Sequence, residues 1–187
     1  MENILRILDN FLEVDEGAKN AFADKLHLIN VERGEIVEAA DSVCSYLYFV
    51  IEGSLRSYYL KDNKDVTVSF TLEGEFTTSI YSFISRNPSY ENIESMETSR
   101  LARIHHDDLL RLFDSYHSLE RVYRKLLEQY YISLEEQLVF AKFKSARERY
   151  LELMENRPKI IQKASVGQIA SYLDMSIETL SRIRAKI

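Results

Sequence analysis

The chain has 187 residues, of which 45% are apolar, and it carries 24 basic against 30 acidic residues for a net charge of −6. This length is enough to bury one large core or two small ones. No apolar run reaches the roughly 18 residues of a membrane span, and residues 1–10 lack a signal-peptide pattern, so we expect a cytoplasmic protein without a membrane partner. The single cysteine, Cys44, excludes an internal disulfide and a four-cysteine iron–sulfur cluster, and we expect it to be a buried thiol.

Two helices are predicted at the start of the chain. Apolar residues recur at helical spacing from Ile4 to Leu12. Asp15 and Glu16 are suited to open a second helix that continues to Leu26, because carboxylates bind the free amides of a first turn.

Residues 29–104 change to short segments rich in β-branched and aromatic residues, which predict strands. The expected strands are 36–37, 46–51, 54–60, 66–72 and 101–104. Glycine-containing turns separate several of them, and Asp62 with Asn63 favours a hairpin. Strands at this spacing are typical of a small antiparallel barrel or roll.

The segment 76–99 has poor periodicity and many hydroxyl groups. We interpret it as a short helix and loop where a pocket for an unidentified small-molecule effector would open; a plain connecting loop is an equal alternative. The candidate pocket residues are Phe76, Thr77, Thr78, Ser79, Ser89 and Tyr90.

Residues 107–156 are predicted to be helical with almost no interruption. Asp107 and Asp108 suit a helix N-terminus. We interpret the neighbouring His105 and His106 as two surface histidines beside this cap, because adjacent side chains point to different sides and no third metal ligand is in register. We therefore expect no metal and no cofactor.

The part of this helical region from 116 to 141 has two adjacent apolar seams, and such a helix needs two surfaces to pack on. We predict that one surface is the chain's own roll and the other is the same helix of a second copy; burial within one subunit is the alternative. The candidate dimer residues are Leu119, Tyr123, Leu126, Leu127, Tyr130, Tyr131, Leu134 and Leu138. A basic connection is expected at 159–163.

Residues 164–187 have the pattern of a helix-turn-helix, because the helical spacing breaks once at 174–176 and then resumes. Ser165 and Gln168 predict a capping box on the first helix, and Ser176 predicts the cap of the second. Asp174 occupies the bend, where aspartate tolerates the left-handed conformation better than most residues.

The second of these helices, predicted over 176–187, has side chains suited to DNA. Arginine binds a guanine edge, glutamate accepts from cytosine, and hydroxyls and lysines suit phosphates. The candidate DNA-binding residues are Ser165, Gln168, Ser176, Glu178, Thr179, Ser181, Arg182, Arg184 and Lys186. From spacing alone, two amphipathic helices with a solvated polar face are the alternative.

Charge is distributed unevenly along the chain. Residues 142–187 carry ten basic and five acidic residues, a net of +5, whereas residues 1–141 carry 14 basic and 25 acidic residues, a net of −11. The basic part contains the predicted helix-turn-helix. This asymmetry favours a nucleic-acid-binding end attached to an acidic sensor or scaffold.

The order of acidic roll, long helix and basic helix-turn-helix resembles the Crp/Fnr family of bacterial transcription regulators over nearly the whole chain. The motifs that carry the resemblance are residues 33–36, 46–56, 73–76, 169–173 and 176–183. It implies that Glu178 and Arg182 read bases beside Ser181, and that Thr179 and Ser165 contact phosphates. Ile177 stands where the family often has arginine, so we expect one base contact to be absent and the operator to differ.

Cyclic-nucleotide binders of this family carry a Gly-Glu pair and an arginine that hold the phosphate. The matching positions here are Thr78, Ser79 and Ser89. A desolvated cyclic phosphate needs cations or donors, whereas Glu91 and Glu94 add negative charge. We therefore predict that the roll does not bind cyclic AMP with useful affinity.

The predicted fold class is α+β: an antiparallel β-roll of double-stranded β-helix type at 1–115, a dimerisation helix at 116–141, and a winged-helix-like helix-turn-helix domain at 142–187. The predicted function is a homodimeric, non-enzymatic transcription regulator that binds a pseudo-palindromic operator in double-stranded DNA. RNA polymerase is a further candidate partner. A cupin-like metal enzyme is disfavoured because the predicted strands contain no histidine; a ligand-binding roll acting through protein partners, without DNA, is the second alternative.

Overall fold

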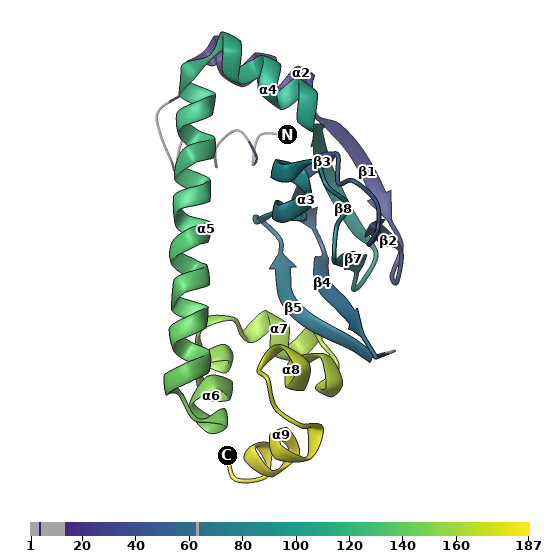
Figure 1. Cartoon of the computed structure of the whole chain (residues 1–187), viewed down its shortest axis with the longest axis vertical. Coiled ribbons are helices and arrows are strands. Elements are labelled where there is room, and N and C mark those ends of the chain that lie inside the picture. The colour runs from purple at the N-terminus through teal and green to yellow at the C-terminus, as the bar shows by residue number, and fades with distance from the viewer. Residues whose placement is uncertain (1–3, 5–13, 63) are drawn as a thin grey trace.

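The structure is a computed structural model that describes residue 4, residues 14–62 and residues 64–187. A β-roll lies beside the upper part of one long helix, and four short helices gather at the lower end of that helix (Figure 1). The first predicted helix falls outside the described residues except for Ile4, which is buried in the core.

Two four-stranded antiparallel sheets form the roll, with strand orders β1-β8-β3-β6 and β2-β7-β4-β5. The strands are β1 (His27–Val31), β2 (Ile36–Glu38), β3 (Tyr46–Glu52), β4 (Ser54–Lys61), β5 (Lys64–Leu72), β6 (Phe76–Thr77), β7 (Asn92–Ser95) and β8 (Ser99–His105). Apolar side chains from both sheets, including Val50, Leu55 and Leu101, form a buried cluster. In the second sheet, β5 is an edge strand.

The five predicted strands are confirmed as β2, β3, β4, β5 and β8. The hairpin is confirmed as well, since Lys61 pairs with Lys64 and Asp62 has a φ of +50°. Three strands were missed, namely β1, β6 and β7, because each is short and lies in a stretch without clear alternation. The roll also contains His27 and His105, so the expectation of strands without histidine was wrong.

Gly53 makes the sharp turn between β3 and β4 possible. Its φ is +99°, and a Cβ at this position would overlap the side chain of Ser99. Any other residue would therefore be strained by its backbone conformation and by the lack of space.

The described helices are α2 (Glu16–Asp24), α3 (Ile80–Ser85), α4 (His106–Ser115), α5 (His117–Phe143), α6 (Ala146–Asn156), α7 (Pro158–Lys163), α8 (Val166–Tyr172) and α9 (Ile177–Arg184). Asp15 caps α2 as predicted. The predicted continuous helix is interrupted at Tyr116, and again where Ser145 caps α6. The expected basic connection is instead the helix α7, which Pro158 can begin because a first-turn amide needs no partner.

The histidines before α4 differ from expectation. His105 itself caps the helix, because its Nδ1 accepts from the Asp107 amide at 3.2 Å. His106 is mostly covered, with its ring edge-on to Phe83 at 5.1 Å between centroids. The predicted capping residues Asp107 and Asp108 lie instead in the first turn of α4, and His106, which was predicted on the surface, is mostly covered.

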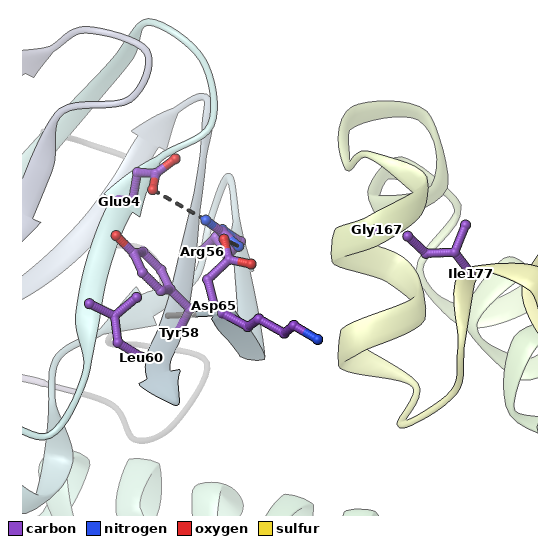
Figure 2. A pocket seen from close by; sticks show the side chains of 8 residues that line it. Arg56, Tyr58, Leu60, Asp65, Glu94, Gly167 and Ile177 are labelled. Carbon is purple, nitrogen blue, oxygen red and sulfur yellow. Dashed lines mark hydrogen bonds and ion pairs between the residues drawn. The ribbon is translucent and has the colours of Figure 1, made fainter. Parts of the chain in front are cut away.

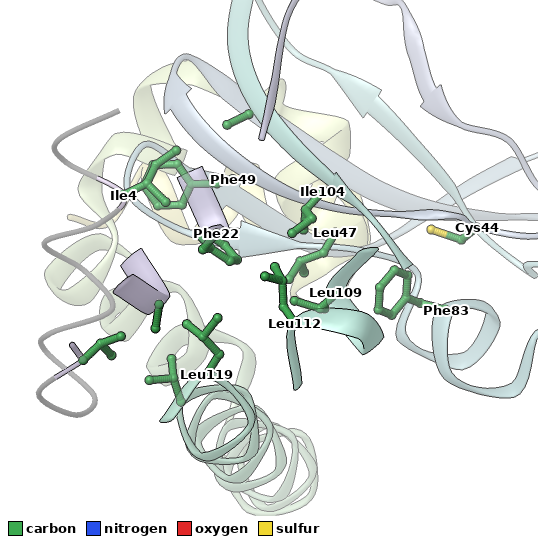
Figure 3. Close-up of a cluster of buried hydrophobic side chains, with 14 residues drawn as sticks. Ile4, Phe22, Cys44, Leu47, Phe49, Phe83, Ile104, Leu109, Leu112 and Leu119 are labelled. Carbon is green, nitrogen blue, oxygen red and sulfur yellow. The ribbon is translucent and has the colours of Figure 1, made fainter. Parts of the chain in front are cut away.

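The N-terminal end of α5 belongs to the main core. Leu119 and Val122 are buried in a cluster formed with α2, α4 and the first sheet, and Figure 3 shows Leu119 near Leu112 and Phe22. Cys44 is fully buried in the same cluster, as predicted. The rest of α5 continues toward α6 with mostly exposed side chains.

Candidate nucleic-acid interface

The two helices α8 and α9 form the predicted helix-turn-helix. Ile169, Ala170 and Leu173 of α8 are buried against Leu180 and Ile183 of α9. The turn between them closes through Asp174, whose φ of +49° is the left-handed conformation expected from the sequence. The winged-helix-like fold predicted for this end of the chain would include strands. Residues 144–187 form helices and turns without a strand, so that part of the prediction was wrong.

Both predicted caps are present. Ser165 and Gln168 form a reciprocal capping box on α8, with Ser165 N–H donating to Gln168 Oε1 at 2.9 Å. Ser176 Oγ accepts from the Thr179 amide at 3.2 Å at the start of α9. These side chains lie at the exposed N-terminal ends of their helices, where hydroxyls and free amides suit phosphate oxygens.

The exposed face of α9 carries Glu178, Ser181 and Arg182. The pKa of Glu178 is lowered by hydrogen bonds from its own backbone amide and from Ser176, helped by the charge of Arg182. The carboxylate is therefore an acceptor at neutral pH, as pairing with the cytosine amino group requires. Arg182 lies over the same helix, and its Nη2 donates to Thr179 Oγ1 at 3.2 Å.

Two candidates at the end of α9 are placed differently. Arg184 is half-buried, and its Nε donates to the hydroxyl of Tyr150 in α6 at 3.0 Å. The helix ends at Arg184, not at Ile187 as predicted, so Lys186 is an exposed residue beyond it. Spacing could not reveal the Tyr150 contact, because the two residues are 34 positions apart, with α7 and α8 between them.

The helix-turn-helix is docked on the edge strand β5 of its own roll, a contact that no sequence pattern indicated. The Thr67 amide donates to Ser171 Oγ at 2.9 Å, and Phe70 packs against Tyr172 with ring centroids 5.1 Å apart. Arg157 donates Nη2 to both carboxylate oxygens of Glu75, at 2.7 and 2.6 Å. An otherwise open sheet edge is thus covered by α8.

A groove of about 550 Å³ lies beside this contact. Figure 2 shows Arg56 and Tyr58 of the roll on one side and Gly167 and Ile177 on the other. Arg56 is only 3% exposed, and its guanidinium pairs with Asp65 at 2.7 Å and Glu94 at 3.2 Å. These carboxylates already neutralise the one buried cation that lines the groove.

The predicted effector-pocket residues do not line this groove. Thr78 Oγ1 donates to the carbonyl of Tyr46 at 2.9 Å, and Ser79 and Ser89 join their hydroxyls at 2.9 Å. Phe76 and Thr77 form β6, and Tyr90 is exposed and stacks on Tyr81. Ser79 and Ser89 are thus brought together as a buried pair, whereas Thr78 and Tyr90 have partners of their own.

Burial raises the pKa of the nearby Glu91 carboxyl, while hydrogen bonds to Ser79 and Ser57 oppose that rise. In the part of the chain that the structure describes, the hydrogen-bond partners of this carboxyl group are hydroxyls and not cations. The buried serine pair predicted to replace the phosphate-binding residues thus lies beside a carboxyl group.

The predicted dimer residues divide along α5. Leu119 is buried in the chain's own core, Tyr123 packs against that core, and Leu126 and Leu127 are half-buried. Further along, four of them are exposed, namely Tyr130, Tyr131, Leu134 and Leu138, with Tyr131 at 70%. The N-terminal part of the predicted seams thus meets the chain's own core or is half-buried, whereas their C-terminal part remains uncovered.

Residues 28–116 match the family of cyclic nucleotide-binding domains. No curated protein sequence matches the chain. Among the residues that the structure describes, no helix is long and apolar enough to cross a membrane.

Similar solved structures cover nearly all of the chain. FixK2 from Bradyrhizobium japonicum has 19% identity and a TM-score of 0.75, over 86% of this chain and 83% of that one. A protein assigned to the Crp/Fnr family from Eubacterium rectale has 20% identity and a TM-score of 0.72, over 92% and 83%. The catabolite activator protein of Thermus thermophilus has 16% identity and a TM-score of 0.61, over 94% and 84%.

The roll, the long helix and the helix-turn-helix therefore have the architecture of a Crp/Fnr regulator, and the predicted α+β fold class is confirmed.

Proposed function

We propose that this protein is a homodimeric transcription regulator that binds double-stranded DNA through α9. The observation that carries the proposal is the exposed Glu178, Ser181 and Arg182 face on a capped second helix of a helix-turn-helix. Glutamate and arginine are residue types that read base edges in the major groove. The fold shared with Crp/Fnr regulators supports this use of the helix.

The uncovered seam of α5 supports the homodimer. Leucine and tyrosine side chains are exposed along one side of this helix. Monomeric proteins rarely expose a large contiguous apolar patch of this kind. Pairing two copies through this seam would relate the two recognition helices by a twofold axis. They could then enter successive major grooves about 34 Å apart, and the operator would be pseudo-palindromic.

We further propose that the roll does not use cyclic AMP as its effector. Burying the cyclic phosphate near Glu91 would place two anions together without a cation to offset them. Any effector of this roll would be another small molecule, acting by changing how the α5 helices pack. The cytoplasmic location and the contact with RNA polymerase stay predictions.

Substituting Arg182 tests the DNA-binding role directly. Arg182→Ala should weaken binding to a selected operator by about 1–3 kcal/mol and relax specificity at one base pair. Fluorescence anisotropy with labelled duplexes measures both. Arg184→Ala is the matched control, because Arg184 bonds Tyr150 and should affect base preference little. Equal affinity and specificity for wild type and Arg182→Ala would refute the role of Arg182.

A further inference from the structure

The first half of α6 holds both ends of α9. Arg149 of α6 donates Nη2 to the carbonyl of Asp174 at 3.1 Å, in the turn that leads into α9. The next residue, Tyr150, is buried, and its hydroxyl accepts from Arg184 Nε at 3.0 Å, at the last residue of α9. Two adjacent side chains of one helix therefore hold α9 where it begins and where it ends, without using its exposed face.

Arg149 also joins this turn to the end of α5, and α6 follows the lower end of α5 and lies near α9 (Figure 1). Its Nη1 donates to the carbonyl of Lys144 at 3.0 Å, and Lys144 caps α5 at its C-terminus. Asp174 stands one position beyond Leu173, the C-terminal cap of α8. A cation is favoured at both places, because the carbonyls at a helix C-terminus carry partial negative charge. One guanidinium thus bridges the ends of two helices.

This bridge connects the helix proposed to form the dimer with the helix proposed to read DNA. The twofold axis of the dimer would lie along the uncovered side of α5, whereas each α9 would enter a major groove. The separation of the two recognition helices therefore depends on the angle between the end of α5 and the start of α9. Arginine suits such a link, because its rigid planar fork binds two acceptors in a fixed geometry, and a lysine ammonium has no such fork.

We propose that Arg149 is a positioning residue that sets the spacing of the two recognition helices in the dimer. This inference rests on the proposed DNA-binding function and adds to it a residue that need not touch DNA. Leu180 of α9 is buried against α8, and this apolar packing does not need the bridge. The bond between Tyr150 and Arg184 would also remain without Arg149. Each α9 should then still recognise one half-site, but the pair should no longer be held at one separation.

Duplexes with one or two half-sites measure this positioning. Half-sites would first be selected from random duplexes with the full chain. Three duplexes are then compared by fluorescence anisotropy at fixed salt. They contain one half-site, two half-sites at the selected spacing, or two half-sites with two base pairs inserted between them. The insertion turns one half-site by about 70° relative to the other, because a helical turn contains about 10–10.5 base pairs.

Wild type should bind the selected pair much more tightly than the single half-site, and the insertion should remove most of this gain. Arg149→Ala should bind the single half-site within about twofold of wild type, but its gain from the second half-site should be about tenfold smaller, the equivalent of one hydrogen bond of a charged group. The insertion should affect this variant less than wild type. Arg149→Lys keeps the charge without the fork, and it should behave like Arg149→Ala.

Arg147→Ala is the matched control. Arg147 is exposed in the first turn of the same helix and is not part of the bridge. Its replacement removes the same charge, so it should change both affinities in the same proportion. This variant should therefore keep the wild-type gain from the second half-site and the wild-type sensitivity to the insertion. Sedimentation velocity checks that every variant is still dimeric.

Two results would overturn the inference. If both Arg149 variants keep the wild-type gain and its sensitivity to the insertion, the bridge does not set the spacing. If they lose affinity for the single half-site and for the pair in equal proportion, Arg149 only stabilises the helix-turn-helix. In either case the regulator function stands, whereas a wild-type chain that gains nothing from a second half-site would refute the proposed dimeric regulator itself.

Discussion

Two arginines of α9, two residues apart, have different partners. Arg182 lies on the exposed face and bonds only groups of its own helix, whereas Arg184 donates to Tyr150 of α6. Residue type and spacing predicted both as DNA contacts. The side chain that remains exposed is the one free to exchange a weak local bond for a base edge. Arg184 instead fastens α9 to α6.

Arg56 is the buried cation of the roll, and it should matter for stability. Arg56→Ala would leave Asp65 and Glu94 without their partner, and breaking such a pair costs about 3–5 kcal/mol. Both carboxylates are partly exposed, which places the expected loss near the lower end. Urea denaturation measures it. Arg111→Ala, which removes an exposed pair with Asp108, should change stability by less than about 1 kcal/mol. A similar small change for Arg56→Ala would contradict this account.

Glu38 should make stability depend on pH. Burial raises its pKa, although the Tyr48 hydroxyl donates to it at 2.7 Å and partly opposes the rise. Because the folded pKa is above the unfolded one, the folded state binds the proton more tightly. Wild type should therefore lose stability relative to Glu38→Gln as pH rises from the unfolded pKa through the raised folded pKa.

Denaturant unfolding between about pH 4 and 8 checks the Glu38 prediction. Tyr48→Phe should steepen the dependence, since it removes a hydrogen bond that favours the ionised form. Parallel stability curves for wild type and Glu38→Gln would show that Glu38 does not titrate differently on folding.

Among the elements, α5 has the least complete packing. Its first turns are buried with α2 and α4, but Leu138 and Phe143 near its other end are 57% and 80% exposed. Ile132, Val139 and Phe143 also lie outside the two predicted seams and are exposed. The helix therefore offers more apolar surface than one roll covers, which is the physical basis of the proposed dimer.

Leu138→Glu should separate the two subunits without unfolding them. Each copy would lose a buried leucine contact of about 1.5–3 kcal/mol, so the dimer should weaken by roughly two orders of magnitude or more. Sedimentation velocity measures the change. Leu110→Glu, at an exposed position on α4, should leave the association unchanged. A Leu138→Glu chain that associates like wild type would rule out this seam as the interface.

Local signals predicted the elements better than their arrangement. The caps at Asp15, Ser165 and Ser176 and the left-handed Asp174 follow from chemistry within a few residues, and all are present. The short strands β6 and β7 pair with β3 and β4, which are distant in the sequence. The residues next to β6 and β7 therefore do not predict these strands. The candidate pocket shows the same limit, because a row of hydroxyls does not reveal which of them bond each other.

At the scale of the whole molecule, the helix-turn-helix and the roll form one connected body. Thr67 and Phe70 of β5 contact α8, and the Arg157–Glu75 pair joins α7's N-terminal end to the turn before β6. These contacts use α8 and the start of α7, while the Glu178 and Arg182 face of α9 stays exposed. A change in the roll can therefore reach α9 through α8 without covering the residues proposed to read DNA.

Hydroxyl-radical footprinting of the full chain on its selected operator tests the paired recognition helices most directly. Two copies of α9 related by a twofold axis should protect two half-sites on one face of the duplex. Their centres should lie about 34 Å, or one helical turn, apart, with inverted sequences. A single protected segment without inverted symmetry, or protection that is the same on every sequence, would contradict the account.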